Sequence, residues 1–347
     1  MEFSILTSGI GFGTYIPAVV LAQQLKSTGA GVSVDILEKL FLDEKKDRLV
    51  ENQKRYHDDF NAAKVAMRIP AMKQQGNYDE ERIQKLLWQW DVKGTQFFIV
   101  FSGSWQDILA EYGRTHKTHI YCVHMDCVVS PSWKGFSLDH EGEAWLIGKG
   151  DGFPETVLYP EQQLPLDKRG NRLLVHGGGW GLGLSTVREN LAEASGYGVY
   201  LVDSFAQDGD PDGVFTYFST GEWHAYEETG RVFPPLYYEG KDINRADEHY
   251  IYKLEKEAVA VISKAGGGTL CESFSGCVPM ILTESAARHE EMNKMKWIRQ
   301  GFGISFEEWS QGGFSRKPLE ECYQRLHTRI GQAQKVLFQE IRKWACN

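Results

Sequence analysis

Short, mostly apolar runs followed by glycine-rich turns recur three times along the chain. The runs lie at Phe3–Thr7, Arg172–Val175 and Ala258–Ser263, and the turns that follow them contain GIGFG, HGGGWG and KAGGG. A continuous apolar run is typical of a parallel strand that is covered on both faces. Each turn leads into a segment with helical character, so we predict strand–turn–helix units and an α/β fold.

The apolar pattern also predicts most of the remaining elements. Further strands are expected at Val32–Leu37, Gln96–Val100, Thr118–Val123, Val199–Asp203, Val214–Ser219, Leu236–Glu239 and from Pro279. Helices are expected from Pro17, over Glu80–Trp90, from Ser185, over Ala246–Lys256, from Thr269 and over most of Arg316–Trp344. The rest of residues 39–95 is charged and irregularly patterned, and the charge run Asp43–Arg48 is expected to be a solvated face.

The length and the repeated unit together predict two domains. A chain of 347 residues suits two domains of about 150–180 residues each. Glycine, proline and charged residues are frequent in Gly148–Arg172, which is typical of an inter-domain hinge. We therefore expect two Rossmann-like domains that face a central cleft: residues 1–155, a linker over 156–171, and residues 172–347.

Composition excludes several classes of function. The net charge of −9 argues against broad nucleic-acid binding, which needs a basic face. The six cysteines form no CxxC pair and no zinc-like spacing, so reduced thiols in a cytoplasmic protein are expected. The apolar N-terminal stretch is interrupted by Gly9, Gly11, Gly13 and Pro17, which favours strand–turn–helix over a signal peptide. No segment is expected to span a membrane.

The third glycine turn predicts an anion site. Gly266, Gly267 and Gly268 allow a sharp turn and leave room for a ligand to approach the backbone. Thr269 is placed to cap the helix that follows. The free N–H groups at the start of that helix would then point at a phosphate.

The stretch SKAGGGTLCESFSGCVPMIL resembles the donor-site signature of GT-B nucleotide-sugar glycosyltransferases. It is similar to that of the bacterial peptidoglycan N-acetylglucosaminyltransferase and of the UDP-glycosyltransferases. In this family a glycine-rich turn precedes Ser or Thr, a Glu three residues later, and a G-x-x-P. Thr269, Glu272, Gly276 and Pro279 stand here in that order. The resemblance implies the GT-B fold.

The resemblance implies a donor site in the second domain. Glu272 corresponds to the residue that accepts hydrogen bonds from the ribose hydroxyls, and Lys264 stands where plant-type relatives have a phosphate-contacting His. The resemblance also places these residues at the donor: Gly177, Gly178, Gly179, Gly266, Gly267, Gly268, Thr269, His289, Glu290 and Asn293. His289 and Glu290 stand where relatives usually have an acid and then a Gln, so the identity of the transferred sugar is left open.

On the acceptor side the chain departs from the family. The turn with Gly11, Gly13 and Thr14 would lie beside the acceptor, but Thr14 stands where many members carry a His as general base. Threonine is no base near neutral pH. His124 and Asp126 follow the strand Thr118–Val123 and are our candidates for that role. The alternative is that the pair only holds a loop by hydrogen bonds.

The expected function is that of an inverting hexosyltransferase. A UDP-sugar would donate its sugar to a hydroxyl of a small-molecule acceptor such as a natural product. We expect no metal and no cofactor, because amides, a helix N-terminus and Lys264 can stabilise the leaving diphosphate. Alternatives are a nucleotide-sugar 2-epimerase of the same fold, a dinucleotide-dependent oxidoreductase, and a non-catalytic nucleotide-sugar-binding subunit. The oligomeric state stays open, with a homodimer as one option.

Overall fold

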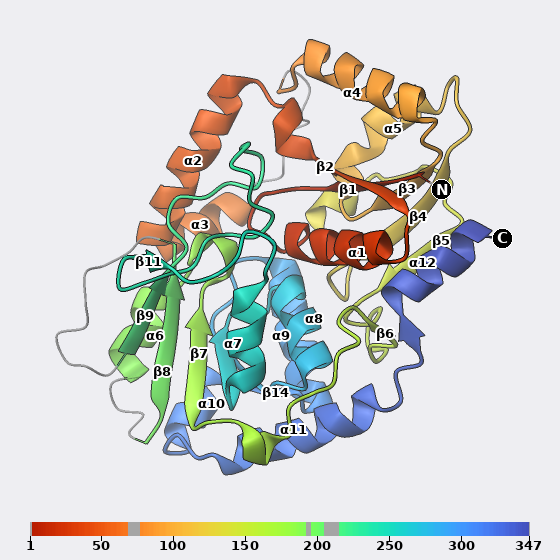
Figure 1. Cartoon of the computed structure of the whole chain (residues 1–347). Coiled ribbons are helices and arrows are strands. Elements are labelled where there is room, and N and C mark those ends of the chain that lie inside the picture. The colour runs from red at the N-terminus through yellow and green to blue at the C-terminus, as the bar shows by residue number, and fades with distance from the viewer. Residues whose placement is uncertain (1, 69–76, 192–195, 205–214, 347) are drawn as a thin grey trace.

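Two parallel sheets form the framework of the molecule (Figure 1). The computed structural model describes residues 2–68, 77–191, 196–204 and 215–346. The first sheet has five strands in the order β2-β1-β3-β4-β5, and all its pairs are parallel. Its strands are β1 (Glu2–Thr7), β2 (Gly31–Ile36), β3 (Phe97–Val100), β4 (His119–His124) and β5 (Gly142–Trp145).

The second sheet has the strand order of a doubly wound nucleotide-binding fold. Its order is β11-β10-β9-β8-β7-β12-β13-β14, with the β10 and β11 pairs antiparallel. The order reverses between β7 and β12, and ligands of such sheets bind above the carboxyl ends at that point. The strands are β7 (Arg172–His176), β8 (Gly198–Asp203), β9 (Phe215–Ser219), β10 (Tyr237–Tyr238), β11 (Lys241–Asp242), β12 (Ala260–Ser263), β13 (Met280–Leu282) and β14 (Gly303–Ser305).

Helices connect the strands in both halves (Figure 1). Those of the first half are α1 (Tyr15–Ser27), α2 (Asp43–Asp58), α3 (Phe60–Arg68), α4 (Glu80–Lys93) and α5 (Gln106–Tyr112). Those that follow β7 are α6 (Leu184–Leu191), α7 (Tyr250–Glu257), α8 (Gly267–Gly276), α9 (Arg288–Gln300), α10 (Phe306–Gln311), α11 (Lys317–Ile330) and α12 (Leu337–Cys346).

Most predicted strands are confirmed to within one or two residues, and three details differ. Val214 lies outside the described residues. Helix α8 already begins at Gly267 with Gly266 at its N-cap, so Thr269 lies inside the helix and the predicted cap was wrong. Helix α7 begins at Tyr250, four residues later than predicted.

The C-terminal segment is not one continuous helix. Strand β15 (Lys335–Val336) separates α11 from α12 and pairs in parallel with β6 (Thr156–Val157). Helix α12 then packs beside α1 in the first half (Figure 1). Its Trp344 ring lies 5.5 Å from that of Phe97 and 5.4 Å from that of Tyr121, and its indole N–H donates to Glu141. The last helix thus completes the core of the first half.

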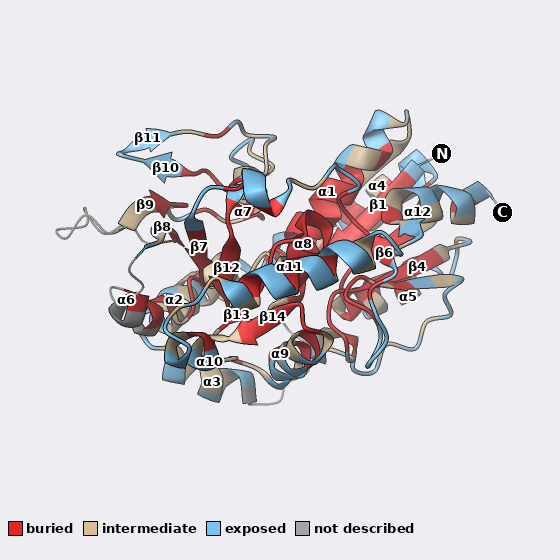
Figure 2. Cartoon of the chain, turned by 90° about the horizontal axis from the view of Figure 1, so that it is seen from below, coloured by how far each residue is buried: buried red, intermediate tan, exposed pale blue. Residues whose placement is uncertain are grey.

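The two halves meet at glycines. A Cβ atom on Gly179 would lie 2.6 Å from the Phe12 ring, and one on Gly268 would lie 3.1 Å from the Gly13 carbonyl oxygen. A Cβ atom on Gly267 would overlap the Met125 carbonyl oxygen. Helix α8 is buried where these contacts occur (Figure 2). Glycine is therefore required here because backbone of one half lies directly on backbone of the other.

Glu255 is a charged residue inside the core. Its side chain, on α7, is fully buried, and neither carboxylate oxygen has a hydrogen-bond partner within the described part of the chain. Burial raises the pKa of Glu255 well above its usual value, and the charge of Glu272 acts in the same direction, while Arg169 opposes both. The carboxyl group is therefore held in its neutral form.

We predict that Gly267→Ala destabilises the protein by about 1–3 kcal/mol, because the new methyl group forces the two halves apart. Alanine favours a helix over glycine by about 1 kcal/mol, so a loss of stability can only come from the contact with Met125. Urea unfolding measures the change. Gly170→Ala, at an exposed glycine with no atom closer than 4.0 Å to the new Cβ, is the control and should change stability by less than about 0.5 kcal/mol. Equal stabilities of the two variants would contradict the prediction.

We predict that the wild-type protein loses stability as pH rises and that Glu255→Gln abolishes the part of this loss that comes from Glu255. Because the folded protein binds this proton more tightly than the unfolded chain, wild-type stability falls as pH rises from about 4.5 towards the raised pKa. The slope is about 1.4 kcal/mol per pH unit within that window. Urea unfolding of both proteins from pH 5 to pH 8 should show the variant gaining on the wild type. Glu257→Gln, at an exposed position of the same helix, should show no such gain.

Candidate functional site

A cavity of about 90 Å³ lies where the strand order of the second sheet reverses. Both halves line it, and the first half contributes the turn that follows β1. Of the predicted site residues, the cavity brings together Gly11, Gly13, Gly178, Gly179, Gly268, Thr269 and Glu272. Two glycine turns and one carboxylate thus converge on a single space.

Glu272 is held by two hydrogen bonds to the same oxygen atom. His249 Nε2 donates to Glu272 Oε1 at 2.6 Å, and the Tyr159 hydroxyl donates to it at 3.1 Å. The His249 ring stacks on Phe233, with centroids 5.2 Å apart and an angle of 3° between the planes. The orientation of the carboxylate is therefore fixed in the absence of a ligand.

Lys264 lies between two glycine turns and forms an ion pair with Glu290. Its Nζ atom is 3.6 Å from the position of a Cβ on Gly266, and its Cε atom is 3.5 Å from that of a Cβ on Gly178. Burial raises the pKa of Glu290, but the charge and hydrogen bond of Lys264, the charge of His289 and the Ala286 amide together outweigh it, so the pKa lies below its usual value. The Glu290 carboxylate is therefore charged.

Asn293 joins the two halves. Its side-chain amide donates to Asp126 Oδ1 at 2.8 Å and to the Ala265 carbonyl at 3.1 Å, and its oxygen accepts from the Cys127 amide at 3.0 Å. The side chain is fully buried. Burial raises the pKa of Asp126, while His289 and the Asn293 hydrogen bond lower it. All polar atoms of the Asn293 side chain are thus used inside the protein.

His124 and Asp126 contact different partners. The His124 ring lies between Trp133 and Trp145, at centroid distances of 4.3 and 4.1 Å. Burial lowers the pKa of His124 to about 4, which makes it a weak base. Neither His124 nor Asp126 lines the cavity. Their role as general base stays a prediction, and so do the individual donor contacts.

His176 lines the cavity and was missed in the sequence. It ends β7, and its Nδ1 atom accepts a hydrogen bond from the Gly178 amide at 3.2 Å. Burial lowers the pKa of His176 to about 4, so the ring is neutral and its proton lies on Nε2. Within the described residues, Nε2 has no hydrogen-bond partner. The signal was its place at the carboxyl end of a strand, directly before three glycines.

A hydrogen-bonded pair beside the cavity was also not predicted from the sequence. His57 of α2 and Asp203 at the end of β8 lie 2.7 Å apart, between His57 Nε2 and Asp203 Oδ1. The hydrogen bond that His57 donates to Asp203 raises the pKa of His57. Asp203 lines the cavity. Only the position of Asp203 at a strand end could have indicated this pair, since α2 carries no apolar stripe.

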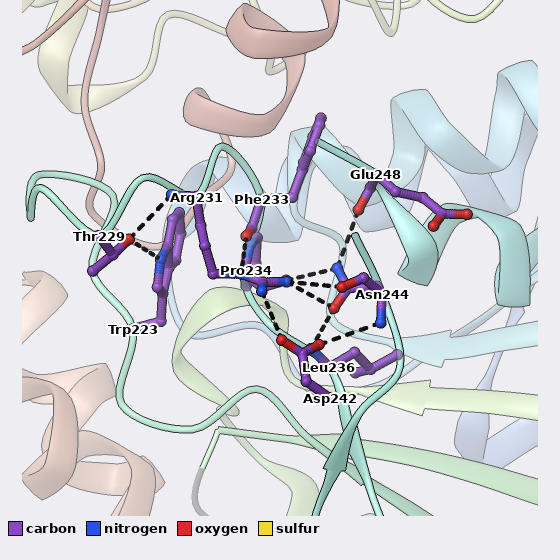
Figure 3. Close-up of polar contacts among 9 residues, drawn as sticks. All are labelled: Trp223, Thr229, Arg231, Phe233, Pro234, Leu236, Asp242, Asn244 and Glu248. Carbon is purple, nitrogen blue, oxygen red and sulfur yellow. Dashed lines mark hydrogen bonds and ion pairs between the residues drawn. The ribbon is translucent and has the colours of Figure 1, made fainter. Parts of the chain in front are cut away.

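Polar contacts hold together the loop that carries Pro234 (Figure 3). Asn244 donates to the carbonyl groups of Pro234 and Glu248 and accepts from the Leu236 amide at 2.7 Å. An ion pair of 2.6 Å between Arg231 and Asp242 lies beside it. These contacts fix Pro234, which lines the cavity.

A small crevice of about 10 Å³, enough for one water molecule, adjoins the cavity and shares Phe12 and Gly179 with it. Half of its remaining wall residues have aromatic rings. The wall residues include Trp180, Trp223, His224 and Tyr226, with Leu49 and Gln53 of α2.

The described residues hold neither a metal cluster nor a membrane-spanning helix. Among residues 2–68, 77–191, 196–204 and 215–346, no group of three or more His, Cys, Asp and Glu side chains is arranged to hold a metal ion. In the same ranges, no helix has the length and apolar character needed to cross a membrane.

Comparisons with known proteins identify the fold. No family model and no curated protein matches the sequence. Among solved structures, MurG from Acinetobacter baumannii is 15% identical, with a TM-score of 0.54 over 99% of this chain and 100% of that chain. The glycosyltransferase SsfS6 from Streptomyces sp. SF2575, complexed with thymidine diphosphate, is 12% identical, with a TM-score of 0.55 over 100% of both chains.

A third similar structure has the same extent. The spinosyn rhamnosyltransferase SpnG, complexed with thymidine diphosphate, is 10% identical, with a TM-score of 0.54 over 99% of both chains. The likeness covers both sheets in each comparison rather than one nucleotide-binding half. This chain therefore has the GT-B fold of nucleotide-sugar glycosyltransferases, as its sequence predicts.

Proposed function

We propose that this protein is a glycosyltransferase that moves a sugar from a nucleotide-sugar donor to a hydroxyl group of a small-molecule acceptor. One observation carries the proposal. The two glycine turns of the second half and Glu272 line a single cavity, at the point where the second sheet reverses its strand order. Glycine amides suit a diphosphate, and a buried carboxylate suits the hydroxyl groups of a nucleoside.

The groups around the cavity support metal-independent departure of a diphosphate. Helix α8 directs its N-terminal amides towards the turn that begins it, which favours an anion there. Lys264 adds a positive charge between the turns, and His176 orients the Gly178 amide through its Nδ1 atom. Such preorganised donors stabilise charge as it develops on a leaving group.

For the donor and the acceptor we propose only the class of molecule. The sequence resemblance favours a UDP-sugar, while the complexes of similar structures make a TDP-sugar the other candidate. The acceptor is proposed from the sequence resemblance as a small molecule, such as a natural product. Attack on the side of the sugar opposite the diphosphate would invert the anomeric carbon. His124 and Asp126 remain the proposed bases.

A non-catalytic nucleotide-sugar-binding protein is the second candidate. The Thr14 hydroxyl donates to the Ser8 carbonyl at 3.1 Å, so it stabilises the turn at the position where relatives carry a base. Transfer or hydrolysis of a nucleotide-sugar would exclude this candidate. Nucleotide binding without either reaction, across a panel of acceptors, would favour it.

We predict that Glu272→Ala weakens nucleotide binding by about 1–3 kcal/mol, because a hydrogen bond to a charged group is lost. Calorimetric titration with UDP and TDP measures this, and NAD should not bind. Glu257→Ala, at an exposed position of α7, is the control and should leave both affinities unchanged.

The titration tests the glycosyltransferase proposal and the role of Glu272 separately. Failure of the wild-type protein to bind either UDP or TDP would contradict the glycosyltransferase proposal. Binding that Glu272→Ala leaves unchanged would keep the proposal and remove the nucleoside contact from Glu272.

We predict that Asn293→Ala lowers the free energy of unfolding by about 3 kcal/mol, because buried Asp126 and Cys127 polar groups lose their partner. Urea unfolding at pH 7 measures the loss. Asn61→Ala, at an exposed position of α3, should cost less than about 0.5 kcal/mol. An unchanged stability of Asn293→Ala would contradict the prediction.

A further inference from the structure

Only one oxygen of the Glu272 carboxylate is available to a ligand. An ionised carboxylate offers two oxygen atoms with two acceptor positions each. Both positions of Oε1 are taken, because His249 Nε2 and the Tyr159 hydroxyl donate to it at 2.6 and 3.1 Å. Within the described part of the chain, Oε2 accepts no hydrogen bond, and it is not a buried unsatisfied atom either. The carboxylate therefore presents Oε2 alone.

Packing prevents the two donors from moving away when a ligand binds. The His249 ring stacks on Phe233, and the Tyr159 ring stacks on Tyr252 at a centroid distance of 4.0 Å. Phe233 belongs to the loop around Asn244, where its carbonyl accepts a hydrogen bond from Arg231 (Figure 3). The side chains of His249 and Glu272 are only 11% and 9% exposed. The two hydrogen bonds that Oε1 accepts are thus part of the folded structure.

The number of free oxygens decides which sugar hydroxyls can be recognised. Ribose presents neighbouring 2′ and 3′ hydroxyl groups, and a carboxylate holds such a diol best with one oxygen on each. A 2′-deoxyribose presents the 3′ hydroxyl alone, for which a single oxygen is enough.

Resting on the function proposed above, we propose that Glu272 recognises a single hydroxyl group of the nucleoside, so that the site binds ribonucleoside and 2′-deoxyribonucleoside diphosphate-sugars almost equally well. His249 and Tyr159 are the positioning residues that remove the preference for ribose. They act through Glu272, by occupying the oxygen that would otherwise bind the 2′ hydroxyl.

The test compares UDP with 2′-deoxy-UDP, which differ only in the 2′ hydroxyl, by calorimetric titration. For the wild-type protein we expect dissociation constants that agree within about threefold. The double variant His249→Phe/Tyr159→Phe keeps both aromatic rings and frees Oε1. In that variant we expect UDP to bind roughly tenfold more tightly than 2′-deoxy-UDP, as for a gained hydrogen bond to a charged group.

A matched control exists in the first half of the molecule. His119 stacks on Phe97 at 4.9 Å and lies 2.7 Å from a carboxylate oxygen of Glu141, and it does not line the cavity. His119→Phe should therefore leave the ratio of the two dissociation constants unchanged. Because both ligands are measured on the same protein, any partial unfolding of a variant cancels in the ratio.

Three results would overturn the inference. A wild-type preference for UDP of tenfold or more would show that the 2′ hydroxyl is recognised, while the proposed function would survive. A double variant whose ratio equals that of the wild type would show that His249 and Tyr159 do not set the preference. Failure of the wild type to bind either nucleotide would remove the proposed function and this inference together.

Discussion

Backbone packed directly on backbone holds the two halves of this molecule together. Gly179, Gly267 and Gly268 of the second half lie against the turn after β1 and the segment after β4, at distances that exclude any side chain. The sequence suggests that these glycines admit a phosphate. The structure adds a second reason, because the neighbouring half occupies the space that their side chains would fill. The cavity remains where the facing turns do not touch.

Burial sets the charge of the polar groups near the cavity. Glu290 keeps its negative charge because Lys264, His289 and the Ala286 amide together outweigh the effect of burial on its pKa. Burial lowers the pKa of His176 to about 4, so its ring is neutral. Burial also raises the pKa of Glu255, which is held in its neutral form. A buried carboxylate thus keeps its charge here where neighbouring groups compensate its burial.

The fold could be predicted largely from the sequence, because parallel strands buried on both faces leave continuous apolar runs. Helices α2 and α3 could not, since α2 has no fully buried residue and hence no apolar stripe. The glycine turns and Glu272 were found through a motif that is local in sequence. His176, His249 and the His57–Asp203 pair were missed, because their roles depend on contacts between segments far apart in the chain. Asn293 matches the motif, but its side chain forms hydrogen bonds between the two halves, and these long-range contacts could not be predicted from the motif.

The return of α12 to the first half has a consequence for synthesis on the ribosome. The first sheet, with Phe97 and Tyr121 on its surface, is translated long before Trp344, which packs against both rings. The contacts of Trp344 with these rings can therefore form only after the second half has been translated. Domains translated first usually fold first. In this protein the first half gains its last packing contacts only after the second half has been synthesised.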